Sequence, residues 1–234
     1  MFYTFITKGI LKPIVKYIYR PEVKGLDKIP KEGKAIFASN HLAASDSIFF
    51  PVYLPRPIVF FAKSDYFYTP GLKGKIQAAF FTGLKQIPVD RRGGEHAKKS
   101  FNSAEDILAR GDFFGIYPEG TRSTDGKLHK GKTGVARIAL ETHTKVYPVA
   151  MINTNKAQPV GTLIPKLKPK VGFIIGDPLD FSKYYDKQDD REILRKVTDE
   201  IMKALQELSG QEYIHEYSQP ATKRLSEEEQ VIRD

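Results

Sequence analysis

A histidine and an aspartate stand five residues apart within residues 40–46, directly after an apolar run. An aspartate at that distance can fold back and accept the second N–H of the imidazole, which fixes the tautomer and stabilises the imidazolium formed during proton transfer. His41 and Asp46 are therefore a candidate general base for a substrate hydroxyl. Taken alone, such a pair is more often structural, with the histidine held by backbone groups and the aspartate capping a helix.

Two further blocks combine glycine with basic side chains. Residues 117–123 read Tyr-Pro-Glu-Gly-Thr-Arg-Ser, and residues 87–94 read Ile-Pro-Val-Asp-Arg-Arg-Gly-Gly. Glycine allows the backbone to approach a ligand closely, and the planar Arg guanidinium suits bidentate binding of phosphate. Both blocks are candidate anion sites, although as isolated turns they are also compatible with ordinary loops.

Together and in this order, the three blocks resemble the sequence motifs of the glycerolipid acyltransferases, and among them the 1-acylglycerol-3-phosphate acyltransferases. The resemblance covers residues 25–155 and includes a fourth block, Val-Tyr-Pro-Val, at residues 146–149. It implies that His41 and Asp46 are the catalytic pair. The substrate-binding residues that it implies are Arg91, Glu119, Gly120, Thr121, Arg122 and Lys132.

The resemblance implies a reaction as well as a site. An acyl group would pass from acyl-CoA or an acyl carrier protein to the free hydroxyl of lysophosphatidic acid, giving phosphatidic acid. The sequence has no cysteine and no Gly-x-Ser-x-Gly nucleophile, so we expect His41 to act as a base in a direct transfer without a covalent acyl-enzyme. No cofactor beyond the acyl donor is expected. Glycerol 3-phosphate or a different lysophospholipid is the alternative acceptor.

The arrangement of apolar segments predicts the elements that position these residues. Apolar runs alternate with helical patterns, which is typical of an α/β fold, and we expect a single mixed sheet covered by helices. The candidate residues follow strands, and ligand sites favour the carboxyl ends of strands. The predicted strands are residues 35–39, 58–62, 113–117, 146–150 and 171–176, and the predicted helices are residues 95–110, 133–143 and 190–208.

The N-terminal segment, residues 1–24, has a membrane-interfacial pattern. Residues 1–20 hold twelve hydrophobic side chains and no acidic ones. Pro13 is predicted to bend or split the helix, which gives two short amphipathic helices suited to the membrane interface. The alternative is a helix packed on the core of the domain itself. The basic residues recur every four positions, at Lys8, Lys12, Lys16 and Arg20.

Three segments follow from these patterns: the interfacial helices at 1–24, an acyltransferase domain at 25–208 and an acidic tail at 209–234. The tail has three basic and six acidic residues, so the positive charge lies in the rest of the chain. The longest stretch without a charged side chain is eleven residues, too short to span a bilayer. We therefore expect peripheral attachment to the cytoplasmic side of the cell membrane.

Other functions fit the sequence less well. The net charge of +9 favours an anionic partner, which includes an anionic membrane surface or nucleic acid, but no recognised nucleic-acid motif accompanies the basic clusters. A basic binding module therefore stays an alternative of a different class, and no nucleic-acid partner is expected. Residues 126–133 match the P-loop pattern, yet no strand leads directly into their first glycine. The five histidines lack metal-binding spacing, and no metal is expected.

Overall fold

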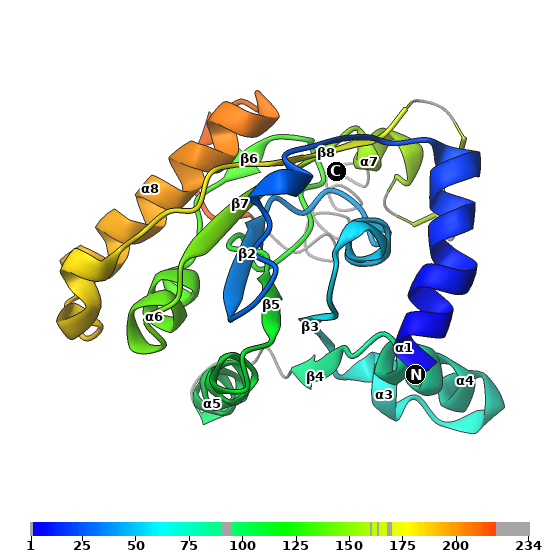
Figure 1. Cartoon of the computed structure of the whole chain (residues 1–234), viewed down its shortest axis with the longest axis horizontal. Coiled ribbons are helices and arrows are strands. Elements are labelled where there is room, and N and C mark those ends of the chain that lie inside the picture. Colours follow the sequence, from blue (N-terminus) through cyan, green and yellow to red (C-terminus); the bar gives the residue numbers. More distant parts are fainter. Residues whose placement is uncertain (1, 90–94, 160, 163, 168–169, 219–234) are drawn as a thin grey trace, which may run out of the picture.

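The computed structural model describes residues 2–89, 95–159, 161–162, 164–167 and 170–218. Seven strands form one mixed sheet with helices on both of its faces, which confirms the predicted fold class (Figure 1). The strands are β1 (Glu22–Lys24), β2 (Ala35–Ser39), β3 (Ile58–Lys63), β4 (Ile87–Val89), β5 (Phe113–Ile116), β7 (Val146–Ile152) and β8 (Gly172–Ile175). Their order in the sheet is β1-β8-β7-β2-β5-β3-β4, and only β7 and β8 pair antiparallel.

Strand β2 lies at the centre of the sheet. All five of its residues are buried, as expected for a parallel strand that is covered on both faces. It pairs with β5 and β7 on its two sides, and Ala38 stands opposite Ile116 in the β2–β5 register. The carboxyl ends of β2 and β5 therefore meet at one edge of the sheet, so the residues that follow them become neighbours.

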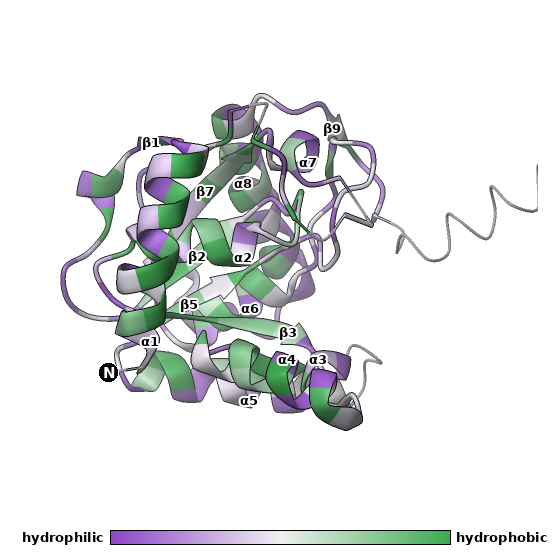
Figure 2. Cartoon of the chain, turned by 90° about the vertical axis from the view of Figure 1, so that its right-hand side faces the viewer, coloured by the Kyte–Doolittle hydropathy of each residue, from purple (hydrophilic) through white to green (hydrophobic). Residues whose placement is uncertain are grey.

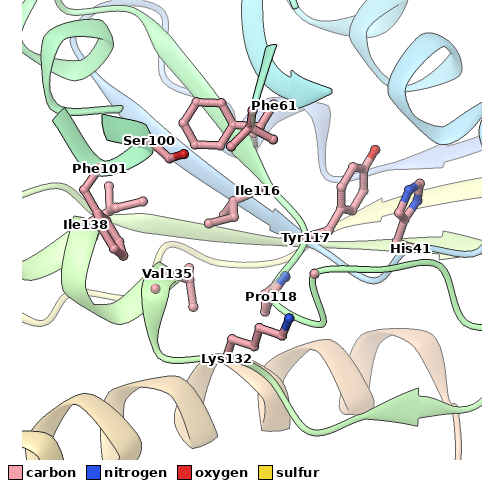
Figure 3. A pocket seen from close by; sticks show the side chains of 14 residues that line it. His41, Phe61, Ser100, Phe101, Ile116, Tyr117, Pro118, Lys132, Val135 and Ile138 are labelled. Carbon is pink, nitrogen blue, oxygen red and sulfur yellow. The ribbon is translucent and has the colours of Figure 1, made fainter. Parts of the chain in front are cut away.

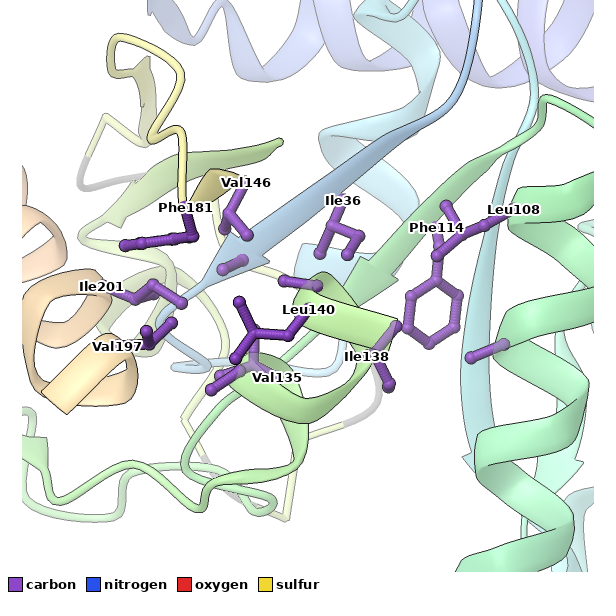
Figure 4. Packing of buried hydrophobic residues seen from close by; sticks show 14 of the residues in the cluster. Ile36, Leu108, Phe114, Val135, Ile138, Leu140, Val146, Phe181, Val197 and Ile201 are labelled. Atoms are coloured by element: carbon purple, nitrogen blue, oxygen red, sulfur yellow. The ribbon is translucent and has the colours of Figure 1, made fainter. Parts of the chain in front are cut away.

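Three helices predicted from the sequence cover one face of the sheet: α5 (Glu95–Ala109), α6 (Gly134–Glu141) and α8 (Arg191–Ser209). Their apolar residues join those of the sheet in one buried cluster, in which Phe114 lies beside Leu108 at one end and Val197 beside Ile201 at the other (Figure 4). Helix α8 begins where the Asp190 carboxylate accepts the N–H groups of the first turn. This face of the molecule is held by ordinary core packing.

The N-terminal helix on the other face differs from the prediction. It runs without interruption from Phe2 to Tyr19, through α1 (Phe2–Thr4), η1 (Phe5–Leu11) and η2 (Ile14–Tyr19), so the predicted split at Pro13 is wrong. The turns on both sides of the proline are wide π-type turns, and Pro13 itself has a helical φ of −57°. A proline ring in a regular α-helix clashes with the carbonyl of the preceding turn, and the wide turns on both sides of Pro13 relieve that clash. Residues 22–24, predicted as helical, form the edge strand β1.

One stripe of this N-terminal helix packs on the body of the protein. Tyr3, Thr7 and Val15 are buried, and the Lys8 Nζ donates to the carbonyl oxygens of Val52, at 3.1 Å, and Leu54. Burial, with a smaller effect of Lys12, lowers the pKa of Lys8. This stripe therefore packs on the core of the domain, as the alternative interpretation of the sequence expected.

Shorter elements complete the described chain. Two helices, α3 (Asp65–Tyr68) and α4 (Gly71–Gly83), join β3 to β4 and have no counterpart in the sequence prediction. The others are η3 (Leu26–Lys28), α2 (Asp46–Phe49), η4 (Pro51–Tyr53), α7 (Thr154–Ala157), η5 (Ser182–Lys187) and the two-stranded sheet of β6 (Leu128–His129) and β9 (Tyr213–Ile214). Among the described residues, no helix combines the length and apolar character needed to cross a bilayer.

Candidate active site

His41 and Asp46 meet directly after β2. The imidazole Nδ1 lies 3.1 Å from Asp46 Oδ2, and the same oxygen accepts the backbone N–H groups of Leu42 and Ala43, each at 2.8 Å. The aspartate is fully buried, and the histidine side chain is 13% exposed. A carboxylate held by two backbone donors keeps its oxygen in place for Nδ1–H, so Nε2 is the basic nitrogen of the ring.

Tyr117, which follows β5, stacks on the imidazole. The two ring centroids are 3.8 Å apart and the planes differ by 11°. The Tyr117 hydroxyl is hydrogen-bonded to Ser47 Oγ at 2.8 Å, and the Phe60 ring also stacks on Tyr117, with centroids 5.5 Å apart. Burial raises the pKa of the Tyr117 hydroxyl well above its usual value. The ring therefore stays neutral and restricts the rotation of His41.

The backbone of His41 is held by the block at residues 117–123. Glu119 Oε2 accepts the His41 N–H at 3.4 Å, and the Ser123 N–H donates to the His41 carbonyl at 2.7 Å. The other oxygen of Glu119 accepts the His129 N–H at 2.9 Å. The block at residues 117–123, which is far from His41 in the sequence, thus holds both backbone polar groups of this histidine.

Glu119 is a buried carboxylate with only 1% of its surface exposed. Burial raises its pKa to about 7, against the opposing effect of the N–H donors of His129 and His41. Its contacts are backbone groups within the fold, so it contributes to the site by positioning. The prediction that Glu119 contacts substrate remains a prediction.

An apolar cavity of about 350 Å³ begins at His41 and continues between β5, α5 and α6. Figure 3 shows His41 and Tyr117 at one end of it and Phe101 and Ile138 at the other. Lys132 lies at the same end of the cavity as His41, next to Gly120. Gly120 has a φ of +74°, a conformation that glycine adopts readily because it has no Cβ. A cavity of this size and lining suits a small apolar group, and its polar groups are gathered at one end.

The sequence of this region matches a known family. The family model described as Acyltransferase matches residues 20–152, which is more than half of the chain. The chain therefore belongs to the acyltransferase family. All of the described site residues, from His41 to Lys132, lie within the matched segment.

Curated relatives and a solved structure agree with this acyltransferase assignment. The chain is 32% identical over 133 residues to the 1-acyl-sn-glycerol-3-phosphate acyltransferase of Borreliella burgdorferi, covering 57% of this chain and 51% of that protein. It is 27% identical over 183 residues to the chloroplastic enzyme LPAT1 of Arabidopsis thaliana, covering 78% of this chain and 50% of that protein. The chain thus spans about half the length of the curated relatives it matches.

The solved structure is that of the 1-acyl-sn-glycerophosphate (LPA) acyltransferase from Thermotoga maritima. It superimposes on 85% of this chain and 80% of its own, with a TM-score of 0.59 and 26% sequence identity. The acyltransferase fold is therefore shared over most of the described residues, well beyond the sequence blocks themselves.

The other predicted acyltransferase residues fall in different places. Thr121 and Arg122 continue the turn after Gly120 and are partly buried. Arg91 lies outside the described residues. The P-loop-like pattern at 126–133 contains strand β6, which pairs with β9, and it has no strand running into its first glycine. The pattern thus lacks the context of a nucleotide-binding loop.

The sequence reasoning missed two groups of this acyltransferase site. Tyr117 was part of a recognised block, but its stacking on His41 depends on the β2–β5 register and has no signal in the spacing of the residues. Asn40 was also unassigned: its side chain donates to and accepts from the backbone of Met151, and it donates to Gln211 Oε1. The one signal in the sequence was the position of Asn40, a polar residue at the end of an apolar strand. A polar side chain that is buried there is expected to be held by hydrogen bonds.

Proposed function

We propose that the protein transfers an acyl group from an acyl thioester to the free hydroxyl of lysophosphatidic acid, giving phosphatidic acid. The observation that carries the proposal is the His41–Asp46 pair at the end of an apolar cavity with Lys132 beside it. Relatives named as 1-acyl-sn-glycerol-3-phosphate acyltransferases support the choice of acceptor. The acyl donor is acyl-CoA or an acyl carrier protein.

In this proposal His41 Nε2 takes the proton of the acceptor hydroxyl as its oxygen attacks the thioester carbonyl carbon. The tetrahedral intermediate then collapses, the carbon–sulfur bond breaks and the leaving thiolate takes the proton from the imidazolium. Asp46 stabilises the imidazolium through Nδ1–H. General-base catalysis of this kind contributes about 10²- to 10⁴-fold.

The remaining groups would bind and orient the two substrates. The apolar walls suit a hydrocarbon chain, and the cationic side chains suit the phosphate of the acceptor. Lys132 lines the cavity, and Arg122 lies in the adjoining turn. Arg91, the third predicted phosphate ligand, keeps that role as a proposal from the sequence. Glycerol 3-phosphate or another lysophospholipid would use the same cationic groups.

A lipid acceptor resides in a membrane, so the enzyme must reach the bilayer surface. The outward stripe of the N-terminal helix exposes Phe5 at 65%, Tyr17 at 65% and Ile18 at 51%. Lys16 and Arg20 lie exposed beside these apolar side chains. An apolar stripe flanked by basic residues binds an anionic interface. The proposed location is therefore peripheral, on the cytoplasmic face of the cell membrane.

The test is an assay of the purified protein with lysophosphatidate and a panel of acyl-CoA and acyl carrier protein donors, with phosphatidate measured by mass spectrometry. Glycerol 3-phosphate and other lysophospholipids are tested in parallel. The proposal expects phosphatidate from lysophosphatidate, formed at least 100-fold more slowly by the His41→Ala variant. Preferential acylation of another acceptor would contradict the assigned substrate, and absence of any transfer would contradict the assigned activity.

A further inference from the structure

The α3–α4 hairpin carries an apolar stripe that faces away from the protein. Leu72 is 75% exposed, Ile76 is 63% exposed and Phe80 is 37% exposed, and the three residues stand four apart on α4. Residues four apart lie on one side of a helix. Tyr68, at the end of α3, is 74% exposed and precedes Leu72 by the same interval. Three large apolar side chains thus stand in one row on α4, and Tyr68 adds a fourth exposed ring on α3.

The opposite side of α4 packs on α3, so the row of apolar side chains faces away from the protein. Phe81 stacks on Tyr66 with centroids 4.8 Å apart and also contacts the Phe67 ring. Gly74 lies so close to the α3–α4 connection that a Cβ there would be 1.9 Å from the Thr69 carbonyl oxygen. The exposed row is therefore a consequence of a defined hairpin and not of a loosely attached helix.

The charges on α4 are all positive. Lys73 and Lys75 are its only charged residues, both are exposed, and the one acidic residue of α3, Asp65, pairs with Lys63. A second copy of this surface would bring lysines against lysines, which disfavours a symmetric dimer through it. An anionic lipid surface complements both the apolar row and the lysines.

The hairpin lies on the same side of the molecule as the N-terminal helix. Figure 1 places both on the right, and Figure 2 shows that side with the two elements exposed together. The hairpin also joins β3 to β4, and Phe61 of β3 and Val89 of β4 line the candidate cavity. A bilayer that contacts the hairpin is therefore close to the walls of the cavity.

We propose that the α3–α4 hairpin is a second membrane contact, which inserts Leu72, Ile76 and Phe80 into the interface of an anionic bilayer beside the N-terminal helix. The inference rests on the proposed function only in that the acceptor is a membrane lipid. A single helix lying in the interface lets the protein rotate about the axis of that helix. A second contact prevents this rotation and fixes the orientation of the protein on the membrane surface. The orientation places the cavity walls next to the lipid that holds the acceptor.

The experiment compares the Leu72→Glu/Ile76→Glu variant with a control of equal change in net charge, Lys203→Glu, on α8 at the far side of the molecule (Figure 1). Partitioning onto vesicles of equal parts phosphatidylcholine and phosphatidylglycerol is measured by flotation. We expect the double variant to bind about 10- to 100-fold more weakly than the control, because two apolar side chains no longer enter the interface. Equal binding by the two variants overturns the proposal.

Activity separates this proposal from the proposed function. Lysophosphatidate is supplied either in vesicles or as a short-chain, dispersed form, and each form is assayed with acyl-CoA and, in parallel, with an acyl carrier protein as donor. The double variant should lose activity only with vesicles, and loss with the dispersed acceptor overturns the membrane role in favour of a role in the site. Loss confined to an acyl carrier protein donor identifies a carrier-docking surface instead. If wild-type protein acylates neither form, the proposed function fails while flotation still tests the hairpin.

A milder variant, Leu72→Gln, tests the same point without added charge. Because Leu72 is mostly exposed, it should unfold at the wild-type temperature and still lose several-fold of its vesicle binding. Unchanged vesicle binding by this folded variant would contradict the insertion of Leu72.

Discussion

The two regions of the molecule to which we assign functions are built in opposite ways. At the ends of β2 and β5, His41 is held by directional hydrogen bonds: its ring by the buried Asp46 carboxylate, and its backbone by Glu119 and Ser123. On the surface formed by the N-terminal helix and the α3–α4 hairpin, apolar side chains stand exposed, and packing occurs on the inner side only.

This difference follows from the tasks that the two regions are proposed to perform. Proton transfer requires atoms placed to within a few tenths of an ångström, and such placement needs rigid surroundings. Contact with a fluid lipid surface depends on apolar area and on net charge, which many side-chain arrangements supply. We therefore expect single-atom changes to have large effects at the strand ends and small, additive effects on the exposed surface.

The largest effect is expected at the catalytic pair. His41→Ala should lower kcat by about 10²- to 10⁴-fold, because no other base replaces Nε2. Asp46→Asn keeps an oxygen that can accept from Nδ1–H but removes the charge that stabilises the imidazolium, so its loss should be smaller than that of Asp46→Ala. Steady-state kinetics of the three variants, with circular dichroism as a control for folding, measure this order. Near-wild-type turnover of His41→Ala would contradict the assignment of the base.

The next effect concerns the cationic side chains. Arg122→Ala should raise the acceptor KM by about 10- to 100-fold and leave the donor KM nearly unchanged, because charge-assisted hydrogen bonds to phosphate contribute roughly 1.5 to 3 kcal/mol each. Lys132→Ala is the companion variant, since Lys132 lines the cavity. A raised donor KM with an unchanged acceptor KM would reverse the assignment of the two substrates.

The comparison also shows what the sequence could predict. Strand β2 and helices α5, α6 and α8 have strong local patterns, and the sequence located them to within a few residues. That His41 and Asp46 could meet was predictable because five residues can form one turn. The contact of Glu119 with the His41 backbone was not predictable, since it depends on two parallel strands being neighbours in the sheet.

The elements of the exposed surface were harder to predict. Helix α4 contains three glycines, at positions 71, 74 and 83, which weaken its helical signal, yet Gly74 is what allows the tight connection through Thr69. At the N-terminus, Pro13 suggested a break, but wide turns on both sides accommodate it. In both cases tertiary packing and an unusual turn outweighed the local preference of the residue.

An intermediate effect is expected from Glu119, on stability. Its pKa rises from 4.5 to about 7 on folding, so the folded state binds more protons than the unfolded state between these values. The free energy of unfolding must therefore fall as the pH rises through this window, by roughly 3 kcal/mol at most from this group. Glu119→Gln removes the titration. Thermal unfolding across the window should show a weaker pH dependence in the variant, and parallel profiles would contradict the raised pKa.

Glu119→Gln also separates positioning from substrate binding. A glutamine has one oxygen for the two backbone N–H groups that the carboxylate accepts, so the hold on His41 should weaken. We expect a lower kcat with an unchanged acceptor KM. A raised acceptor KM with normal kcat would instead support the substrate contact that the sequence resemblance implies.

The smallest effect is expected on the exposed surface, from one basic side chain of the N-terminal helix. Lys16 is exposed and lies next to Tyr17, and each lysine near an anionic leaflet contributes about 1 kcal/mol. Lys16→Gln should therefore weaken binding to phosphatidylglycerol-containing vesicles by about 5-fold. Lys203→Gln, with the same change in net charge on α8, should bind like wild type. The two variants should converge at about 1 M salt, where the Debye length is roughly 3 Å, and a difference that persists there would show that Lys16 acts through packing instead of charge.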